Sequence, residues 1–442
     1  MKCMTEKRRF YSLPVRLFGS IRGRIFYGWW IVVLGSLING VGGGIFFHGF
    51  TVFFLPLKSD FNVSSTAISL LYGAARLEGG FEGPVVGYLI SKFGPRAMII
   101  AGVCMAGGGL LLLSLVRDYW TFFFVFVFVV YLGYNAGFFH PVTAAVNNWF
   151  IRHRGVGFSS VGATSCAGGM IMAPLLSWII QNFGWRAGAV TAGLILLIIC
   201  LPAAIPIRRS PELMGLYPDG ASSREGSRHE SHSSLDVGEF DFSVKEALRT
   251  RAYWILMGTI SLRLFVTTAI NAHFIPILVW RDMSETTGAY LVSLYACSSI
   301  FATVVIGWIG DRWNKPLVCS LGLMPMIIAM IGLVFSQAAL PLYFFAVGFA
   351  ITMGTAPLNW ALIGDFFGRR SYATLRGMMA ISYGATGFLS PIYAGWIYDS
   401  TGSYTLVLIT FSVVLLTTAC LFTILHLASP PKSPRYYTYG RG

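Results

Sequence analysis

The sequence predicts an all-α membrane protein whose twelve transmembrane helices form two pseudo-symmetric six-helix bundles. Of the 442 residues, 55% are hydrophobic and 11% are charged, whereas soluble domains carry about 25% charged residues. The apolar residues gather in runs of about 20, the length that crosses a bilayer core as a helix. The two halves of the chain also share sequence features. Together these observations exclude most soluble enzymes, secreted disulfide scaffolds and nucleic-acid-binding folds.

The predicted spans are the apolar runs that lie between charges, glycines and prolines. In the first half they cover 28–55, 64–90, 97–116, 119–144, 155–180 and 186–207. In the second half they cover 252–280, 287–310, 316–335, 340–364, 376–398 and 403–427. Six spans in each half are consistent with two bundles of equal size.

The domain boundaries follow from these spans. Residues 28–207 are expected to form the N-terminal bundle and 252–427 the C-terminal bundle. Between them, 208–251 is rich in serine and mixed charges. That composition cannot bury a core, so we expect a flexible linker. The basic segment 1–27 and the segment 428–442 are expected to be tails.

The Lys and Arg residues are distributed unequally between the two sides of the predicted membrane. If both termini and the linker lie on one side, that side holds 26 of them and the other side holds 4. Cytoplasmic loops carry the excess of positive charge in membrane proteins. We therefore expect a multi-pass protein of the cell (inner) membrane with both termini in the cytoplasm. The net charge of +14 reflects this topology and does not indicate a nucleic-acid partner.

An internal repeat relates the two halves at an offset of about 215–222 residues. The loop 87–96 after the second span resembles the loop 307–315 after the eighth, and 160–164 matches 382–386. Parallel six-helix repeats place a substrate site at their interface, near the midplane of the bilayer.

These loops resemble the loop motif G-x-L-x-D-R-x-G-R-R of the major facilitator superfamily. The second-half copy keeps Gly307, Asp311, Arg312 and Lys315, and the first-half copy keeps Gly87, Leu89, Gly94 and Arg96. Ser91 and Lys92 stand where that motif has Asp and Arg. The segments 27–30, 76–80 and 94–96 are similar to those of a narrower branch, the bacterial transporters that resemble monocarboxylate transporters and oxalate:formate antiporters.

This resemblance implies the major facilitator fold and secondary active transport of a small organic anion. It also implies that spans one, four, seven and ten line the cavity, while spans three, six, nine and twelve lie outside. Members of the branch use a membrane-buried arginine in the second half to bind their anionic substrates. In the familiar members that arginine lies in span eight, which here has none before Arg312.

Four charged residues lie deep within predicted spans, where each costs about 2.5–3.5 kcal/mol on insertion scales. Glu78 and Glu82 are one turn apart on one helix face, so we expect one of them to hold a proton near neutral pH and to couple transport to protons. Arg76 lies about 200° around the helix from Glu78 and is expected to serve another neighbour. The alternative is a structural charge cluster that ties span two to span four or span eleven.

Arg263 in span seven is the leading candidate for substrate binding. Its guanidinium offers a fork of donors that matches a carboxylate, and Asn271 lies two turns away on the same face. The alternative is a structural ion pair. Further candidates for substrate binding are Arg76, Tyr131, Asn135 and Asn359, and His273 is a candidate proton relay.

Charged residues near helix ends on the basic face predict a cytoplasmic gate held by salt bridges. The candidates are Asp311, Arg312, Asp365 and Arg96. Ordinary positive charge on cytoplasmic loops accounts for the arginines without a gate, but not for the two aspartates.

The sequence contains no phosphate-binding loop, no H-E-x-x-H motif and no paired Cys/His spacing. We therefore expect a transporter that is not an enzyme and needs no cofactor or metal. Its expected partners are a small organic anion, protons and the lipid bilayer. The alternatives are anion exchange, export of amphipathic compounds, and a sensor that has lost transport.

Overall fold

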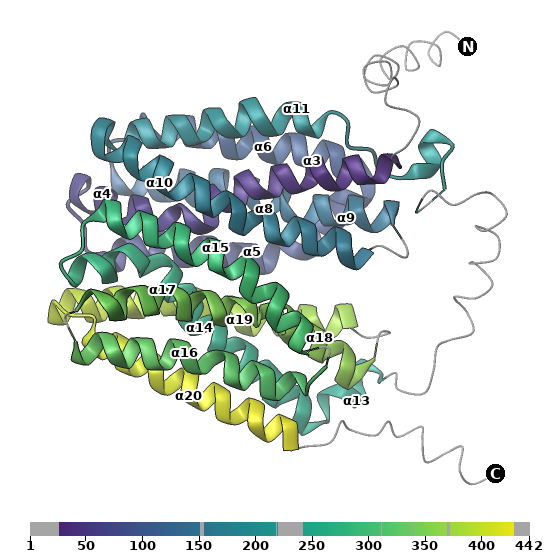
Figure 1. Cartoon of the computed structure of the whole chain (residues 1–442). Coiled ribbons are helices and arrows are strands. Elements are labelled where there is room, and N and C mark those ends of the chain that lie inside the picture. Colours follow the sequence, from purple (N-terminus) through teal and green to yellow (C-terminus); the bar gives the residue numbers. More distant parts are fainter. Residues whose placement is uncertain are drawn as a thin grey trace.

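The computed structural model describes residues 26–150, 154–217, 219, 242–310, 312–336, 338–368 and 372–427. The described part of the chain is built from helices. They stack as two layers, the first half of the chain in one and the second half in the other (Figure 1). The predicted gate residue Asp311 lies outside the described residues.

The first half contains six helical rods, some of which are interrupted. The first rod consists of α3 (Tyr27–Gly42), η2 (Gly43–His48) and α4 (Phe50–Asp60), and α5 (Ser65–Phe93) and α6 (Pro95–Leu113) follow it. The fourth consists of α7 (Tyr119–Val125), η3 (Phe126–Tyr131), α8 (Leu132–Gly137) and α9 (Phe139–Trp149). The last two are α10 (Arg154–Ile195), η4 (Leu196–Cys200) and α11 (Leu201–Ala204). They are separated at Gly184, whose φ of 83° is not helical.

The second half contains the other six rods. They are α14 (Arg251–Trp280), α15 (Glu285–Gly310), α16 (Lys315–Phe335), the pair α17 (Ala339–Gly354) and α18 (Ala356–Phe367), α19 (Tyr372–Thr401) and α20 (Thr405–Leu427). Between the halves lie two short elements, η5 (Pro211–Met214) and α13 (Val244–Leu248).

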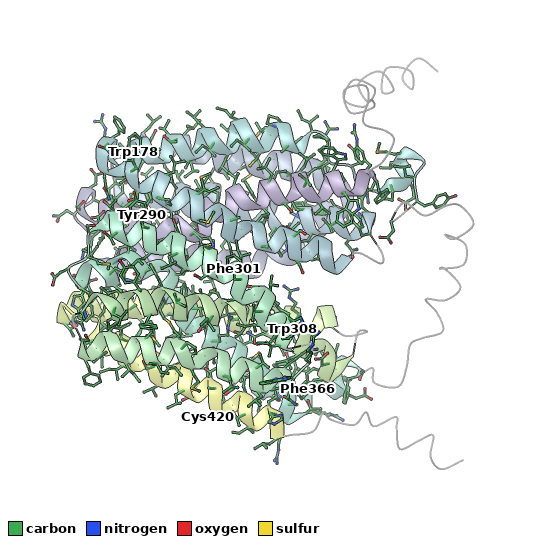
Figure 2. The ribbon with its side chains drawn as sticks, viewed as in Figure 1. Trp178, Tyr290, Phe301, Trp308, Phe366 and Cys420 are labelled. Atoms are coloured by element: carbon green, nitrogen blue, oxygen red, sulfur yellow. The ribbon has the colours of Figure 1, made fainter. Side chains whose placement is uncertain are left out.

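Length and apolarity alone identify nine membrane-spanning segments in the described residues. One of these, Gly157–Ala204, contains the two rods joined at Gly184. The remaining two rods are α5 and α19, which are more polar. The fold class is therefore as predicted, with twelve spans. Large apolar side chains cover the outer surface, among them Trp178, Tyr290, Phe301 and Trp308, each more than half exposed (Figure 2). Such a surface suits contact with lipid.

The halves meet mainly along two pairs of helices, α5 with α19 and α10 with α15, and α14 also contacts α4. Tyr27, where α3 begins, and Leu427, where α20 ends, lie at the same end of the molecule (Figure 1). We call this end the basic end, because the predicted positive loops belong to it, and the other end the far end.

Both ends of the predicted linker 208–251 pack against the bundles. The backbone carbonyl of Arg208 accepts a hydrogen bond from the indole of Trp149. Phe242 is 2% exposed, and its backbone N–H donates to the carbonyl oxygen of Phe367. A capping box formed by Ser243 and Glu246 starts α13. The folded bundles therefore extend into both ends of the segment expected to be flexible.

Candidate functional site

A cavity between the halves has a volume of about 620 Å³. It lies between the middle of the helices and the basic end. Its lining comes from both halves: Ala75, Arg76, Gly79, Asn135 and His140 from the first, and Leu264, Thr268, Trp360, Gly377, Ala380, Ile381, Tyr383, Gly384 and Gly387 from the second.

Most of this lining belongs to α5 and α19, whereas the resemblance implied spans one, four, seven and ten. Span one contributes no lining residue among those described. The reason lies in the small residues of the two lining helices. Gly79, Gly384 and Gly387 have no side chains to fill the space, so the polar groups of neighbouring helices reach it.

A second hollow lies nearer the basic end than this cavity does. It has a volume of about 370 Å³ and is lined by Gly87, Ile90, His140, Thr143, Ala144, Asn147 and Phe158. His140 lines both spaces. α5 runs toward the basic end and reaches it at Phe93. Gly87 and Ile90 therefore lie closer to that end than Arg76 does.

Arg76 lines the cavity. Among the described lining residues it is the one Lys or Arg. One terminal nitrogen donates to the hydroxyl of Tyr72 over 2.5 Å. The guanidinium also lies over the rings of Phe47 and Tyr72, with centroids at 4.9 and 4.8 Å. Its Nε is buried and has no hydrogen-bond partner among the described residues. Neither of the two ion pairs in the described structure involves Arg76.

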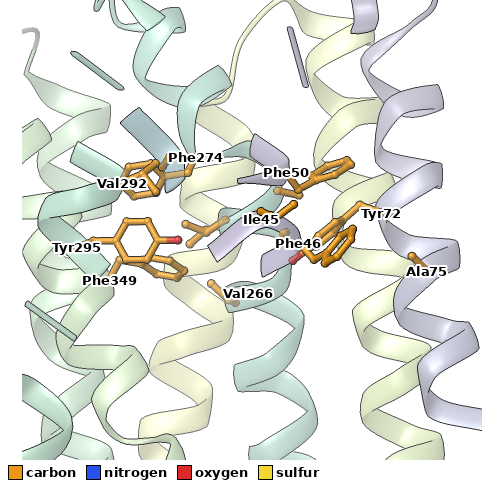
Figure 3. Packing of buried hydrophobic residues seen from close by; sticks show 14 of the residues in the cluster. Ile45, Phe46, Phe50, Tyr72, Ala75, Val266, Phe274, Val292, Tyr295 and Phe349 are labelled. Carbon is orange, nitrogen blue, oxygen red and sulfur yellow. The ribbon is translucent and has the colours of Figure 1, made fainter. Parts of the chain in front are cut away.

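A chain of buried hydrogen bonds leads from Arg76 into the other half. Asn271 of α14 donates to the Tyr72 hydroxyl over 2.9 Å and to the backbone carbonyl of Phe47 over 2.6 Å. The Tyr295 hydroxyl donates to the Asn271 side-chain oxygen over 2.9 Å and lies 2.6 Å from Nδ1 of His48. Figure 3 shows Tyr72 and Tyr295 on opposite sides of the first rod. This network joins the halves at the far-end limit of the cavity.

Glu78 and Glu82 point away from Arg76, toward the fourth rod. The Asn135 side-chain amide donates to Glu78 over 3.3 Å. The other oxygen of Glu78 and both oxygens of Glu82 are buried without a partner in the described structure. An ionised carboxylate without donors is costly in an apolar medium. The bond between Asn135 and Glu78 links α5 to α8, which is the link between spans two and four that the structural alternative expects. It still leaves three of the four carboxyl oxygens without donors in the described structure.

Arg263 lies within the second half and does not line the described cavity. It is 3% exposed and donates from Nε to the Thr355 hydroxyl over 3.1 Å and from a terminal nitrogen to the Thr352 carbonyl over 2.7 Å. These acceptors lie at the junction of α17 and α18. No described carboxylate pairs with Arg263. The negative end of the α17 dipole takes that place, since free carbonyls at a helix C-terminus favour a cation.

The other candidates for substrate binding differ in position. Asn135 lines the cavity. Asn271 is 1% exposed, with its amide nitrogen and oxygen engaged in the network above. The Tyr131 hydroxyl donates to the Phe46 carbonyl within the first half. Asn359 is 1% exposed and accepts a hydrogen bond from Cys319. Of these four, Asn135 alone lies at the cavity.

His273 lies at the far end, in contact with both halves. Its Nε2 is 2.8 Å from the Ser69 hydroxyl and 3.1 Å from the Pro391 carbonyl, and its Nδ1 is 2.9 Å from the Tyr404 hydroxyl. These contacts place it in the closure of the far end, apart from the cavity lining.

Two of the predicted gate residues, Asp365 and Arg312, make side-chain contacts within the second half. Asp365 pairs with Lys315 over 2.7 Å, within the second half. Arg312 stacks on Trp308, 3.9 Å from the ring centroid. Arg96 opens α6 in the first half. The cavity lies toward the same basic end, and the salt-bridged gate stays a prediction.

Sequence analysis did not assign Tyr72, Tyr295 or His48 to the site. For Tyr72 a signal was present, because it precedes Arg76 by four residues and therefore shares its helix face. Tyr295 and His48 gave no such signal. Their partners lie on other helices: His48 and Tyr295 are 247 residues apart in the chain, and Tyr295 and Asn271 are 24 apart.

A sequence model of the Major Facilitator Superfamily matches residues 32–278 and 256–438. Monocarboxylate transporter 13 of Rattus norvegicus is 26% identical over 389 residues, which cover 86% of this chain and 84% of that protein. Monocarboxylate transporter 2 of Mus musculus is 25% identical over 416 residues, covering 88% and 82%.

Two solved structures share the fold. A D-xylose-proton symporter superposes with a TM-score of 0.67 at 16% identity, covering 92% of this chain and 99% of that one. A bacterial homolog of the human lysosomal transporter Spinster, in an inward-facing and unoccupied conformation, also gives a TM-score of 0.67 at 16% identity, covering 92% and 96%.

Proposed function

The chain belongs to the Major Facilitator Superfamily, a family of membrane transporters, and from this premise we propose that it carries a small organic anion across the cell membrane. The substrate is a monocarboxylate or a compound of similar size and charge. The relatives named as monocarboxylate transporters support this class. The transport cycle is alternating access, in which the 28–207 half rocks against the 252–427 half.

The observation that carries the proposal is the free side of Arg76. Its guanidinium lines the interfacial cavity, and no described carboxylate neutralises it. A buried charge without a partner is costly, and an anionic substrate removes that cost when it binds. Asn135 lines the same cavity and offers a neutral polar contact.

We assign the basic end to the cytoplasm, from the distribution of Lys and Arg. The cavity then belongs to a conformation that is open toward the cytoplasm, with the far end closed. In the opposite conformation the basic end closes, and the candidate gate residues Arg96, Arg312 and Asp365 would come together there. Asp311 is the fourth residue of that proposed gate.

Proton coupling is the proposed driving force, with Glu78 and Glu82 as the proton acceptors. Three of their four carboxyl oxygens are buried without a donor in the described structure. Uptake of a proton by one of them offsets the entry of a negative charge at Arg76. Symport of an anion with a proton is then electrically neutral.

The test is transport by the purified protein in proteoliposomes, with lactate, pyruvate, acetate and benzoate as probes. We expect an inward proton gradient to drive accumulation of at least one of them. Arg76→Ala should abolish this accumulation and Arg76→Lys should restore part of it. Arg186→Ala is the matched control, since Arg186 pairs with Asp60 at the far end, away from the cavity.

Four results would overturn the proposal or part of it. Equal anion uptake by Arg76→Ala and wild-type protein would remove Arg76 from the site. Efflux of amphipathic dyes without any anion flux would identify an exporter of such compounds. No flux of either kind, with a folded protein, would favour a sensor. Anion uptake that strictly requires a counter-anion and needs no proton gradient would identify an exchanger. That result would refute proton coupling and leave the anion substrate in place.

A further inference from the structure

We propose that the hydroxyl of Tyr72 is the second donor of the anion site, and that Asn271 of the opposite half positions it. This inference rests on the proposed function, because it concerns the anion that Arg76 binds. It identifies Tyr72 as a specificity-determining residue and Asn271 as a positioning residue.

The direction of the network is set at the backbone carbonyl of Phe47. A carbonyl oxygen can only accept, so the group of Asn271 that lies 2.6 Å from it is the amide NH₂. The Asn271 oxygen therefore faces Tyr295, whose hydroxyl must donate to it. With its proton used in this way, Tyr295 accepts from Nδ1–H of His48.

The same reasoning applies to Tyr72. The second hydrogen of the Asn271 amide points at the Tyr72 oxygen, 2.9 Å away. The Arg76 guanidinium has only donors, so it also donates to the Tyr72 oxygen, over 2.5 Å. A phenolic oxygen has two lone pairs, and both are now occupied.

The proton of the Tyr72 hydroxyl is left without an acceptor. No described atom accepts a hydrogen bond from Tyr72, although its side chain is 0% exposed. A buried donor without an acceptor costs free energy that an incoming acceptor recovers. The Tyr72 hydroxyl therefore lacks an acceptor for its proton. It lies next to the Arg76 guanidinium, which lacks a carboxylate partner among the described residues.

An anionic oxygen that approaches Arg76 can satisfy both groups. The guanidinium nitrogen and the Tyr72 oxygen are adjacent, because the residues are one turn apart on α5 and already hydrogen-bonded. The guanidinium carbon also lies 4.9 and 4.8 Å from the ring centroids of Phe47 and Tyr72, and its Nε has no partner among the described residues, which leaves that N–H for a ligand. One cation with one neutral donor suits a monoanion better than a dianion.

Asn271 makes this donor dependent on the contact between the halves. Tyr72 lies on α5 in the first half and Asn271 on α14 in the second. If the halves separate at this level, the Tyr72 oxygen loses one of its two donors. Its proton is then free to rotate toward other acceptors, and the anion loses a fixed partner. The complete site accordingly belongs to the conformation in which the far end is closed.

The experiment compares anion affinity in full-length variants, with whichever of lactate, pyruvate, acetate and benzoate the wild-type protein binds most tightly. Tyr72→Phe should raise the apparent KM roughly 10- to 100-fold, the usual loss for a hydrogen bond to a charged group, with little change in maximal rate. Asn271→Leu should raise KM by a smaller factor. Tyr393→Phe is the control, since Tyr393 donates to Thr410 outside the cavity.

A second variant keeps the tyrosine in place. Incorporation of 3-fluorotyrosine at position 72 makes the hydroxyl a stronger donor and a weaker acceptor. At a pH where it stays protonated, we expect anion binding to tighten several-fold. A purely structural Tyr72, which only accepts from Arg76 and Asn271, predicts weaker or equal binding, and that result would overturn the inference.

The outcomes also separate the inference from the proposed function. If anion binding depends on Arg76 but stays within twofold of wild type in Tyr72→Phe, the second donor is refuted and the anion site stands. If the wild-type protein binds none of the four anions, the proposed function fails and this inference fails with it.

Discussion

The carboxylate of Asp399, near the end of α19, caps the beginning of α5 in the other half by accepting hydrogen bonds from the backbone N–H and the hydroxyl of Thr66, over 2.7 and 2.6 Å. Its other oxygen accepts from the backbone N–H of Ser65 over 2.9 Å. A carboxylate at a helix N-terminus satisfies otherwise free N–H groups and interacts favourably with the helix dipole. Here the cap and the helix belong to different halves.

Asp399→Ala should therefore weaken closure of the far end. Loss of a cap costs about 0.5–2 kcal/mol, and a loss of about 1–2 kcal/mol shifts the equilibrium between closed and open far ends by roughly a factor of 5–30. Spin labels at Ser59 and Ser284, one on each half at the far end, would report the change as a larger population of long distances.

Asp118→Ala serves as the control for this experiment. Asp118 also caps a helix at the far end, but it accepts from Thr121 of its own half. We expect lower thermal stability without any change in the distances between labels. An equal shift of distances in both variants would show that Asp399 acts through general stability.

Arg263→Ala should reduce the stability of the protein but leave its affinity for the anion nearly unchanged. The substitution removes two hydrogen bonds from a charged group to the junction of α17 and α18, at a cost of about 1–3 kcal/mol, while Thr355 still donates to the Thr352 carbonyl. We expect a lower melting temperature and a lower maximal transport rate, with KM for the anion nearly unchanged. A large rise in KM, equal to that of Arg76→Ala, would instead identify Arg263 as a substrate ligand.

Glu78→Gln and Glu82→Gln test the proposed proton coupling. Each amide keeps the size of the side chain but cannot take up a proton. In the variant of the coupling residue, a pH gradient should no longer drive accumulation, while exchange of internal and external anion should continue. If both single variants, and the double variant, still accumulate anion against its gradient at the wild-type rate, neither carboxyl carries the proton.

Two glycines of α6 should respond in opposite directions to the same substitution. A Cβ at Gly102 would meet the backbone of Gly133 and Gly137 in α8, whereas a Cβ at Gly108 meets nothing within 4 Å. Gly102→Ala should destabilise the protein by about 1–3 kcal/mol. Gly108→Ala should stabilise it by about 0.5–1 kcal/mol through helix propensity. Thermal unfolding in detergent would measure both, and a destabilised Gly108→Ala would contradict the assigned packing.

Sequence analysis identified the residues that carry charge within the spans, because an apolar run makes each charge conspicuous. It ranked Arg263 above Arg76, since span seven was expected to line the cavity. The two arginines differ in their neighbours: α5 borders the cavity through Ala75, Arg76 and Gly79, whereas Arg263 faces the junction at Thr355. That difference depends on how each helix is rotated within its bundle.

By itself the sequence determined that the chain spans a membrane twelve times in two related halves, because hydrophobic run length, loop charge and internal repetition are local properties of the chain. Only the tertiary structure decided that Arg76 faces the cavity, that Tyr72 meets Asn271 and that Asp399 caps α5. These pairs join residues about 200 or more positions apart. Helix packing alone brings such residues together, because it sets which face of each helix meets which neighbour.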